Sequence, residues 1–224
     1  SCTVRVDHNY FLNCPYPEGG AFWVVRGQVY GVIDNNYFTG SPHMDYYGYD
    51  SAWTYHAFHF GSPDQLYFED NVFETTTTIN TVGVGGRVCF RYNTFTFTAG
   101  NIYPIHDMHG NQPNGNSAGM GCEIYENTYN AGLRNAQWWG MRGGKSLVYN
   151  NYYVGDAPSV FGLYRDEYDD RLGPGVPVHA ITGQPQHVSE SYSWNNMQGI
   201  KRIGSVITEQ IDYGGTIGVV PQFD

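Results

Sequence analysis

One short pattern of apolar and polar positions recurs along the chain. In each copy an apolar residue stands three positions before an asparagine, and an aromatic residue stands two positions after it. The six copies are centred on Asn9, Asn36, Asn71, Asn93, Asn127 and Asn151. Apolar and polar residues alternate before each asparagine, a period of two that is typical of strands. An internal repeat of this kind indicates a stacked-repeat architecture.

The spacing of the copies predicts how the strands are arranged. The asparagines recur at intervals of 22 to 35 residues. The shorter intervals are close to the minimum for one turn of a wide coil that has three short strands and three bends. The longer intervals add residues to a bend, which costs little entropy. Since no helical pattern separates the copies, βαβ units are excluded and an all-β, single-stranded parallel β-helix is expected.

The repeated asparagine has a physical role in such a coil. Equivalent residues of successive turns lie about 4.8 Å apart, one strand spacing. An asparagine amide both donates and accepts hydrogen bonds, so the six side chains are predicted to form a ladder. The aromatic residues two positions later are expected to stack in the same way. Six unrelated asparagine turns are the alternative, and the matching apolar flanks argue against it.

The repeat also sets the expected boundaries. We predict a coil over residues 1–172, and irregular turns or a C-terminal cap of the same domain over residues 173–224. No amphipathic helix precedes Val4, so the first turn would expose unpaired backbone groups and apolar side chains. We therefore expect this end to be covered by an upstream domain, by the returning tail, or by a second subunit stacked end to end.

The amino-acid composition limits the classes of partner that the chain is expected to bind. The chain has 224 residues and a net charge of −10, which disfavours nucleic acids and anionic membranes. No apolar run approaches the roughly 20 residues of a membrane span. Cys2 and Cys14 flank the first repeat and could form a disulfide in an oxidising compartment. Cys89 and Cys122 occupy non-equivalent strand positions, and buried thiols are the expectation for both.

Several short motifs carry a family resemblance. They are Gly-Val-Ile-Asp at 31–34, the strand 68–73, Arg-Tyr-Asn-Thr-Phe at 91–95 with His109-Gly110, Arg-Gly-Gly at 142–144 before Tyr-Asn-Asn at 149–151, and Trp-Asn-Asn at 194–196. From about residue 30 to 215 the chain resembles right-handed parallel β-helix proteins of the pectate-lyase-like superfamily, and within it uncharacterised bacterial and phage proteins. Residues 172–190 depart from that pattern. The resemblance implies a polysaccharide partner and an extracellular, secreted or virion-surface location.

Two long insertions, 39–54 and 101–121, predict where a site would lie. Both follow equivalent strands, so they are expected to wall a groove over the next strand face. That face is predicted from residues 21–26, 55–60, 81–85, 117–121 and 137–142. The candidate catalytic residues are His59, with His56 as an alternative, Asp107, His109 and Arg142. The candidate substrate-binding residues are Tyr46, Tyr47, Trp138 and Arg165.

Each candidate has a chemical reason and a structural alternative. Arg142 is suited to bind a substrate carboxylate through two hydrogen bonds, or it ties down a bend. His59 or His109 can transfer protons near neutral pH, or serves as a structural group. His106 and His109 lack a third ligand, so no metal site is predicted. The acidic run 164–171 could hold Ca²⁺, although a solvated surface is the simpler interpretation.

A second stripe consists of the residues two positions before each ladder asparagine. It contains Asp7, Asp34, Glu69, Arg91, Tyr125 and Tyr149. If these side chains point outward, Asp34 and Glu69 form either an acid/base pair or part of a charge ladder neutralised by Arg91. The charge ladder is the interpretation that we favour.

The sequence leaves two classes of function open. The first is an enzyme, a lyase or glycoside hydrolase that binds and cleaves a polysaccharide between the two insertions. The alternative is a non-catalytic structural or adhesive module of a fibre, filament or tailspike. The lack of any catalytic motif of a characterised lyase or hydrolase favours the alternative, and the mixture of His, Arg, Asp and aromatic residues favours the enzyme.

Overall fold

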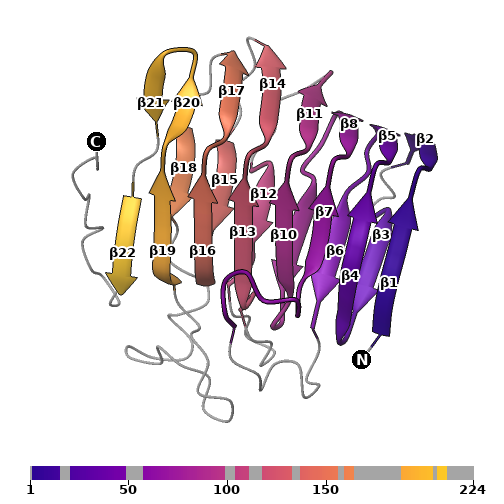
Figure 1. Ribbon diagram of the computed structural model, residues 1–224, viewed down its shortest axis with the longest axis horizontal. Coiled ribbons are helices and arrows are strands. Elements are labelled where there is room, and N and C mark those ends of the chain that lie inside the picture. The colour runs from indigo at the N-terminus through magenta and orange to yellow at the C-terminus, as the bar shows by residue number, and fades with distance from the viewer. Residues whose placement is uncertain are drawn as a thin grey trace.

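The computed structural model describes residues 2–15, 21–48, 58–98, 104–110, 118–132, 137–155, 159–163, 188–203 and 206–210. Within these ranges every regular element is a strand, and the strands form three sheets (Figure 1). No helix long and apolar enough to cross a membrane occurs in this part of the chain. The predicted all-β class is confirmed.

The first sheet has eight strands. In spatial order they are β1 (Cys2–Asp7), β4 (Val29–Asp34), β7 (Leu66–Glu69), β10 (Arg87–Arg91), β13 (Gly121–Tyr125), β16 (Gly144–Tyr149), β19 (Val188–Trp194) and β22 (Val206–Gln210). The second sheet also has eight strands. They are β2 (Tyr10–Cys14), β5 (Tyr37–Gly40), β8 (Val72–Thr75), β11 (Thr94–Phe97), β14 (Thr128–Gly132), β17 (Tyr152–Gly155), β20 (Asn196–Gln198) and β21 (Lys201–Ile203).

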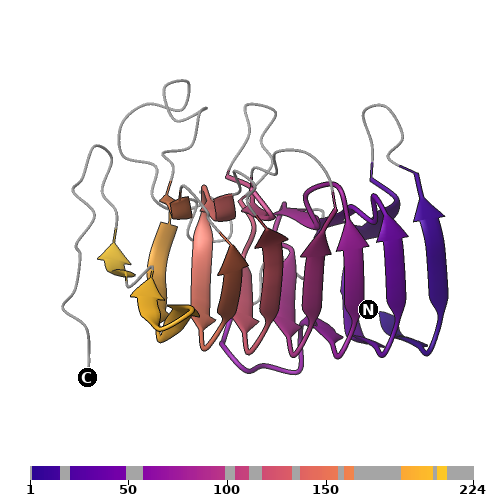
Figure 2. The same ribbon diagram turned by 90° about the horizontal axis from the view of Figure 1, so that it is seen from above.

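The third sheet has six strands, which are β3 (Trp23–Arg26), β6 (Met44–Tyr47), β9 (Asn80–Gly83), β12 (His106–Met108), β15 (Gln137–Met141) and β18 (Ser159–Leu163). From β1 to β18 the chain visits the three sheets in a fixed order, and each strand from β1 to β17 pairs in parallel with the strand three elements later. Seen from above, the successive turns lie side by side along the long axis (Figure 2). Only the β19–β22 and β20–β21 pairs are antiparallel among the described strands. This arrangement is compatible with a parallel β-solenoid.

The predicted asparagine ladder is present at the bend between the first and second sheets. Each ladder amide donates to the side-chain oxygen of the next, with nitrogen–oxygen distances of 2.9 to 3.1 Å. A further member, Asn196, accepts from Asn151. The repeat pattern missed it because Ser193 replaces the apolar residue three positions earlier and Gln198 replaces the aromatic residue.

The residue before each ladder asparagine has a left-handed backbone conformation. The φ angles lie between 48° and 61° at His8, Asn35, Asp70, Tyr92, Glu126, Asn150 and Asn195. This conformation turns the chain out of one sheet and into the next. Asn and Asp tolerate it better than other residues with a side chain, which explains the recurrent Asn-Asn and Asp-Asn pairs. Tyr92 and Glu126 carry a conformational strain at this position.

The core lies inside the three sheets. The aromatic residues two positions after the first six ladder asparagines stack with ring centroids 4.7 to 4.9 Å apart, as predicted. They are Phe11, Phe38, Phe73, Phe95, Tyr129 and Tyr153. From Phe38 onward each is at most 2% exposed. Burial of this column and its apolar neighbours supplies the main driving force for folding.

The third sheet differs from the sequence prediction. Strands β6 and β12 occupy the places assigned to residues 55–60 and 117–121, so each proposed insertion contains a strand of the third sheet. Met44 and Tyr46 are buried while Asp45 and Tyr47 are partly exposed, an alternation that the polar and aromatic composition of this stretch obscured. The described part of 55–60 begins at Phe58 and belongs to no sheet.

The segment Phe58–Gln65, which we call the strap, crosses the outer face of the first sheet (Figure 1). A Cβ at Gly121 would collide with the ring of Phe58. The backbone N–H of Gly61 donates to a carboxylate oxygen of Glu123 at 2.7 Å. The described residues 58–65 of the segment between β6 and β7 therefore cover the first sheet.

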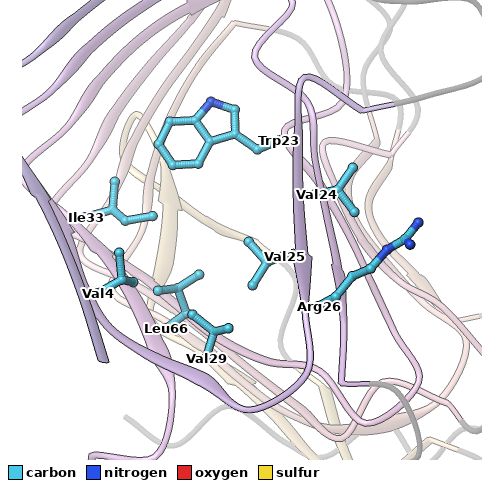
Figure 3. A pocket seen from close by; sticks show the side chains of 8 residues that line it. All are labelled: Val4, Trp23, Val24, Val25, Arg26, Val29, Ile33 and Leu66. Atoms are coloured by element: carbon cyan, nitrogen blue, oxygen red, sulfur yellow. The ribbon is translucent and has the colours of Figure 1, made fainter. Parts of the chain in front are cut away.

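A cavity of about 630 Å³ opens at the end formed by the first strands. Its lining residues are Val4, Trp23, Val24, Val25, Arg26, Val29, Ile33 and Leu66. Figure 3 shows Trp23 and Val25 pointing into it, whereas Arg26 points away. In the described residues, β1, β2 and β3 each pair with a strand on one side only. The expectation that another domain, the returning tail or a second subunit covers this end stays a prediction.

Candidate functional site

The candidate site is the outer face of the third sheet, over β6, β9 and β12. Asp45, Thr81 and Asp107 occupy register-equivalent positions on these three strands. Side chains alternate across a strand, so this row lies opposite the buried Met44, Asn80 and His106. The face therefore presents two carboxylates on either side of a threonine.

A two-nitrogen ion pair holds one of these carboxylates. Arg142 Nε donates to Asp107 Oδ1 at 3.2 Å, and Arg142 Nη2 donates to Asp107 Oδ2 at 2.5 Å. The side chain of Asp107 is 12% exposed, and that of Arg142 is 21% exposed. The backbone N–H of Arg142 also donates to the carbonyl of Met108 at 2.9 Å. The predicted bidentate chemistry is present, but its acceptor is Asp107 of the same chain.

The other carboxylate contacts a histidine that sequence reasoning missed. His43 Nε2 lies 3.0 Å from Asp45 Oδ1, and its Nδ1 lies 3.0 Å from the carbonyl oxygen of Thr78. Thr81 Oγ1 is 3.4 Å from the same Nε2. The signal for this cluster is the alternation in His-Met-Asp-Tyr-Tyr at 43–47, a stretch that the sequence prediction places in an insertion.

Beside this row lies a second group that contains Tyr47 and His109. Tyr47 pairs in register with Gly83. A Cβ at Gly83 would lie 3.3 Å from the ring of Tyr47 and 3.4 Å from the Cβ of His109. Because Gly83 has no side chain, the ring of Tyr47 and the Cβ of His109 can both lie close to its backbone. His109 Nδ1 donates to the carbonyl of Gly110 at 3.2 Å.

Four predicted site residues lie away from this face or outside the described residues. Tyr46 is 0% exposed and its hydroxyl donates to the carbonyl of Val29 at 2.5 Å, so its ring is a core residue and offers no surface to a sugar. His59 is exposed on the strap over the first sheet. The side chain of Trp138 and the whole of Arg165 lie outside the described residues, as do His56 and the acidic run 164–171.

His106 and His109 do not form a metal pair. His106 is 1% exposed inside the core. Its Nδ1 lies 2.5 Å from Asn80 Oδ1, and its Nε2 lies 2.9 Å from the hydroxyl of Tyr129. Burial lowers the pKa of His106 to about 3, so the ring is neutral at ordinary pH. Across the described residues, no group of three or more His, Cys, Asp or Glu side chains could hold a metal.

The second stripe forms the predicted column on the outer face of the first sheet. Strand pairing aligns Asp7, Asp34, Glu69, Arg91, Tyr125, Tyr149 and Trp194. Arg5 contacts Asp34 at 3.1 Å, and Arg91 contacts Glu69 at 2.5 Å. Each of these two carboxylates thus has its own arginine, which supports the charge-ladder interpretation.

The aromatic end of this column is a poor platform for sugars. The rings of Tyr125 and Tyr149 are 4.7 Å apart, and those of Tyr149 and Trp194 are 4.5 Å apart, both nearly parallel. Sugar rings stack on aromatic faces, and these faces largely cover one another. Within the stack each ring covers a face of its neighbour, while Trp194 at its end is 40% exposed.

The four cysteines are free thiols. Cys2 is exposed, while Cys14, Cys89 and Cys122 are buried. Burial raises the pKa of the Cys89 thiol well above its usual value, with the nearby Glu123 carboxylate adding to the effect. The expectation of buried thiols at Cys89 and Cys122 is confirmed, and a nucleophilic role does not fit such a raised pKa.

Comparison of the chain with protein-family models, with curated proteins and with solved structures gives no match. The three parallel sheets agree with the coil that the sequence predicts. The resemblance to the pectate-lyase-like superfamily rests on the sequence motifs described above.

Proposed function

We propose that this chain is a right-handed parallel β-helix of the pectate-lyase-like type that binds a polysaccharide and hydrolyses it. The proposed binding face is the outer surface of the third sheet over β6, β9 and β12. We place the protein outside the cell or on a virion surface, where such polymers occur. The observation that carries the proposal is the row of Asp45, Thr81 and Asp107, with Tyr47 and His109 beside it.

The shape of this face suits an extended polymer. Its polar side chains come from successive turns, so they are repeated along the coil at about one strand spacing. Carboxylate, hydroxyl and imidazole groups can each bond to sugar hydroxyls. A partly exposed tyrosine, Tyr47, adds an amphipathic ring beside them. A rigid sheet fixes these groups better than a loop would.

The two carboxylates support hydrolysis. Asp45 and Asp107 are separated by Thr81, hence by two strand spacings, about 9.6 Å at the backbone. Hydrolysis with inversion uses two carboxyl groups about 6.5–9.5 Å apart, slightly less than this backbone spacing, which leaves room for a water molecule. We assign Asp45 as the acid that protonates the leaving oxygen, and Asp107 as the base that activates water. His109, two residues after Asp107, is a further group that can exchange protons on this face.

A non-catalytic structural or adhesive module is the second candidate. The apolar cavity between the first strands favours it, because a second subunit or another domain seated there would bury that surface. This role predicts self-association or attachment to a larger particle, and it predicts no release of sugar. The two candidates therefore differ in a directly measurable product.

The test is an assay of reducing-end release from a panel of polysaccharides. The wild type should release oligosaccharides from at least one polymer. Asp45→Asn, which keeps the shape of the side chain, should reduce the rate more than tenfold at an unchanged melting temperature. Glu74→Gln on β8 of the second sheet is the matched control and should keep full activity. Activity that survives in Asp45→Asn would remove Asp45 from catalysis.

A further inference from the structure

The Arg142–Asp107 pair has a consequence for the kind of polysaccharide that the face can accept. A guanidinium binds a carboxylate through two parallel N–H donors, which is why arginine so often recognises sugar acids, phosphates and carboxylates. Here both donors of one edge of Arg142 already point at the two oxygens of Asp107. At this edge of the guanidinium, a substrate carboxylate would have to displace a carboxylate that is covalently part of the protein.

We propose that Asp107 is a specificity-determining residue that occupies the Arg142 guanidinium and restricts the face to neutral polysaccharides. This inference rests on the proposed function and narrows it. In this arrangement Asp107 takes the place that the carboxylate of a uronic acid would otherwise fill. Polymers of uronic acids or sulfated sugars are excluded, and chains of neutral hexoses or pentoses are accepted.

The charges around the pair also favour neutral polysaccharides over acidic ones. An acidic sugar on this face would approach the carboxylate of Asp45 and an Arg142–Asp107 pair whose charges cancel. The charge of Arg142 is balanced by Asp107, and the ring of His43 lies against Asp45. The whole chain carries a net charge of −10, which adds a general repulsion toward polyanions. Neutral sugars meet no such repulsion and can bond to every one of these groups.

The chemistry of cleavage follows from the substrate class. A lyase removes a proton from the sugar carbon next to a carboxylate, and the carboxylate makes that proton acidic enough to leave. A neutral sugar has no such group. Cleavage of a neutral chain therefore adds water, with hydroxide going to the anomeric carbon and a proton to the departing oxygen. This balance needs only the two carboxylates and water.

The experiment compares binding of neutral and acidic polymers to the wild type and to three variants. The probes are a panel of neutral polymers (cellulose oligomers, xylan, mannan and dextran) and two polyuronates, polygalacturonate and alginate, measured by affinity electrophoresis at low salt. Asp107→Ala exposes the guanidinium, Arg142→Ala removes it, and the double variant removes both. Thermal melting of each variant reports folding separately.

We expect the wild type to bind at least one neutral polymer and neither polyuronate. Asp107→Ala should gain polyuronate affinity by tenfold or more, and the double variant should lose that gain. If Asp107→Ala does not fold, Asp107→Asn serves in its place, with a smaller expected gain because its amide oxygen still accepts one hydrogen bond.

The possible failures can be told apart. Wild-type binding of a polyuronate that Arg142→Ala abolishes would overturn the inference and leave the proposed face intact. Binding of neutral polymers without any gain of polyuronate affinity in Asp107→Ala or Asp107→Asn would also overturn the role given to Asp107. If the wild type binds no polymer at all, the proposed function falls, and the inference falls with it.

Discussion

Arg142 and Asp107 are 35 residues apart in the chain and form a two-nitrogen ion pair across neighbouring turns of the third sheet. The pair joins the bend after β15 to the middle of β12. Both side chains are largely shielded from solvent, at 21% and 12% exposed. The contact therefore serves the local structure as well as the chemistry of the face.

Removing one partner of this pair should destabilise the fold more than removing both. Arg142→Ala leaves the shielded Asp107 carboxylate without its cation, at a cost of about 2–4 kcal/mol in the free energy of unfolding. The double variant with Asp107→Ala should recover at least half of that loss. Urea unfolding of the four proteins closes the thermodynamic cycle. A loss in the double variant that equals the sum of the two single losses would show that the two charges are not coupled.

The asparagine ladder should be sensitive to a single deletion. Asn93 accepts from Asn71 and donates to Asn127 and to the carbonyl of Phe68. Asn93→Ala orphans these buried partners, which costs about 1–3 kcal/mol. Asn130→Ala is the control, since Asn130 makes one long contact of 3.4 Å at the outer surface. A melting temperature unchanged in Asn93→Ala would refute a stabilising ladder.

The left-handed bend offers a stabilising substitution. Glu126 has a φ of 58°, a conformation that costs most residues about 1–2 kcal/mol and costs Asn less. Glu126→Asn should raise the free energy of unfolding by about 0.5–1 kcal/mol. The same change at Glu74, which lies within strand β8, should lower stability because Asn is disfavoured in strands. Chemical denaturation of the two variants gives the comparison, and a loss at Glu126 would contradict the conformational argument.

Burial of His106 predicts a fall in stability in mild acid. Its pKa is about 3 in the folded protein, compared with 6.5 for the ordinary side chain. Between these values the unfolded chain binds a proton that the folded chain excludes. The stabilising contribution of the neutral ring is therefore complete above pH 6.5 and is lost as the pH falls toward 3, by up to about 1.4 kcal/mol per pH unit.

His106→Gln removes this titration and should flatten the decline of stability between pH 6.5 and pH 4, whatever its effect at neutral pH. His109→Gln, on the outer side of the same sheet, is the matched control and should retain the slope. Thermal unfolding across that pH range measures both. An identical slope in wild type and His106→Gln would assign the acid sensitivity to other groups.

The features that repeat were predictable from the sequence. The asparagine ladder and the aromatic stack follow from a spacing that is copied in every turn, and the column from Asp7 to Tyr149 follows from the same register. Asn196 escaped prediction because its flanks, Ser193 and Gln198, are polar. A periodic pattern identifies the residues that every turn has in common. It does not identify a turn whose flanking side chains differ from that pattern.

The candidate site depends on features that do not repeat. Asp107 and Arg142 are candidates from the sequence, but their pairing requires the alignment of β12 with β15, which sequence spacing alone does not fix. Asp45 is not predicted as a site residue because the sequence places β6 inside an insertion. Residues 55–60 show a clearer alternation of apolar and polar residues, and the pattern assigns them to the strand instead. The location of His59 on the strap is missed for the same reason. A strand of mixed polar and aromatic residues, such as β6, has a weaker alternation of apolar and polar positions than residues 55–60, so the sequence pattern favours the wrong segment.

A polysaccharide bound to the outer face of the third sheet should protect the backbone beneath it from amide hydrogen exchange. The experiment measures exchange with and without an oligosaccharide, with the second sheet as an internal reference. We expect added protection in β6, β9, β12 and the residues that follow β12, and none in β8 or β11. Protection confined to the first sheet around Trp194, or no change anywhere at saturating oligosaccharide, would contradict it.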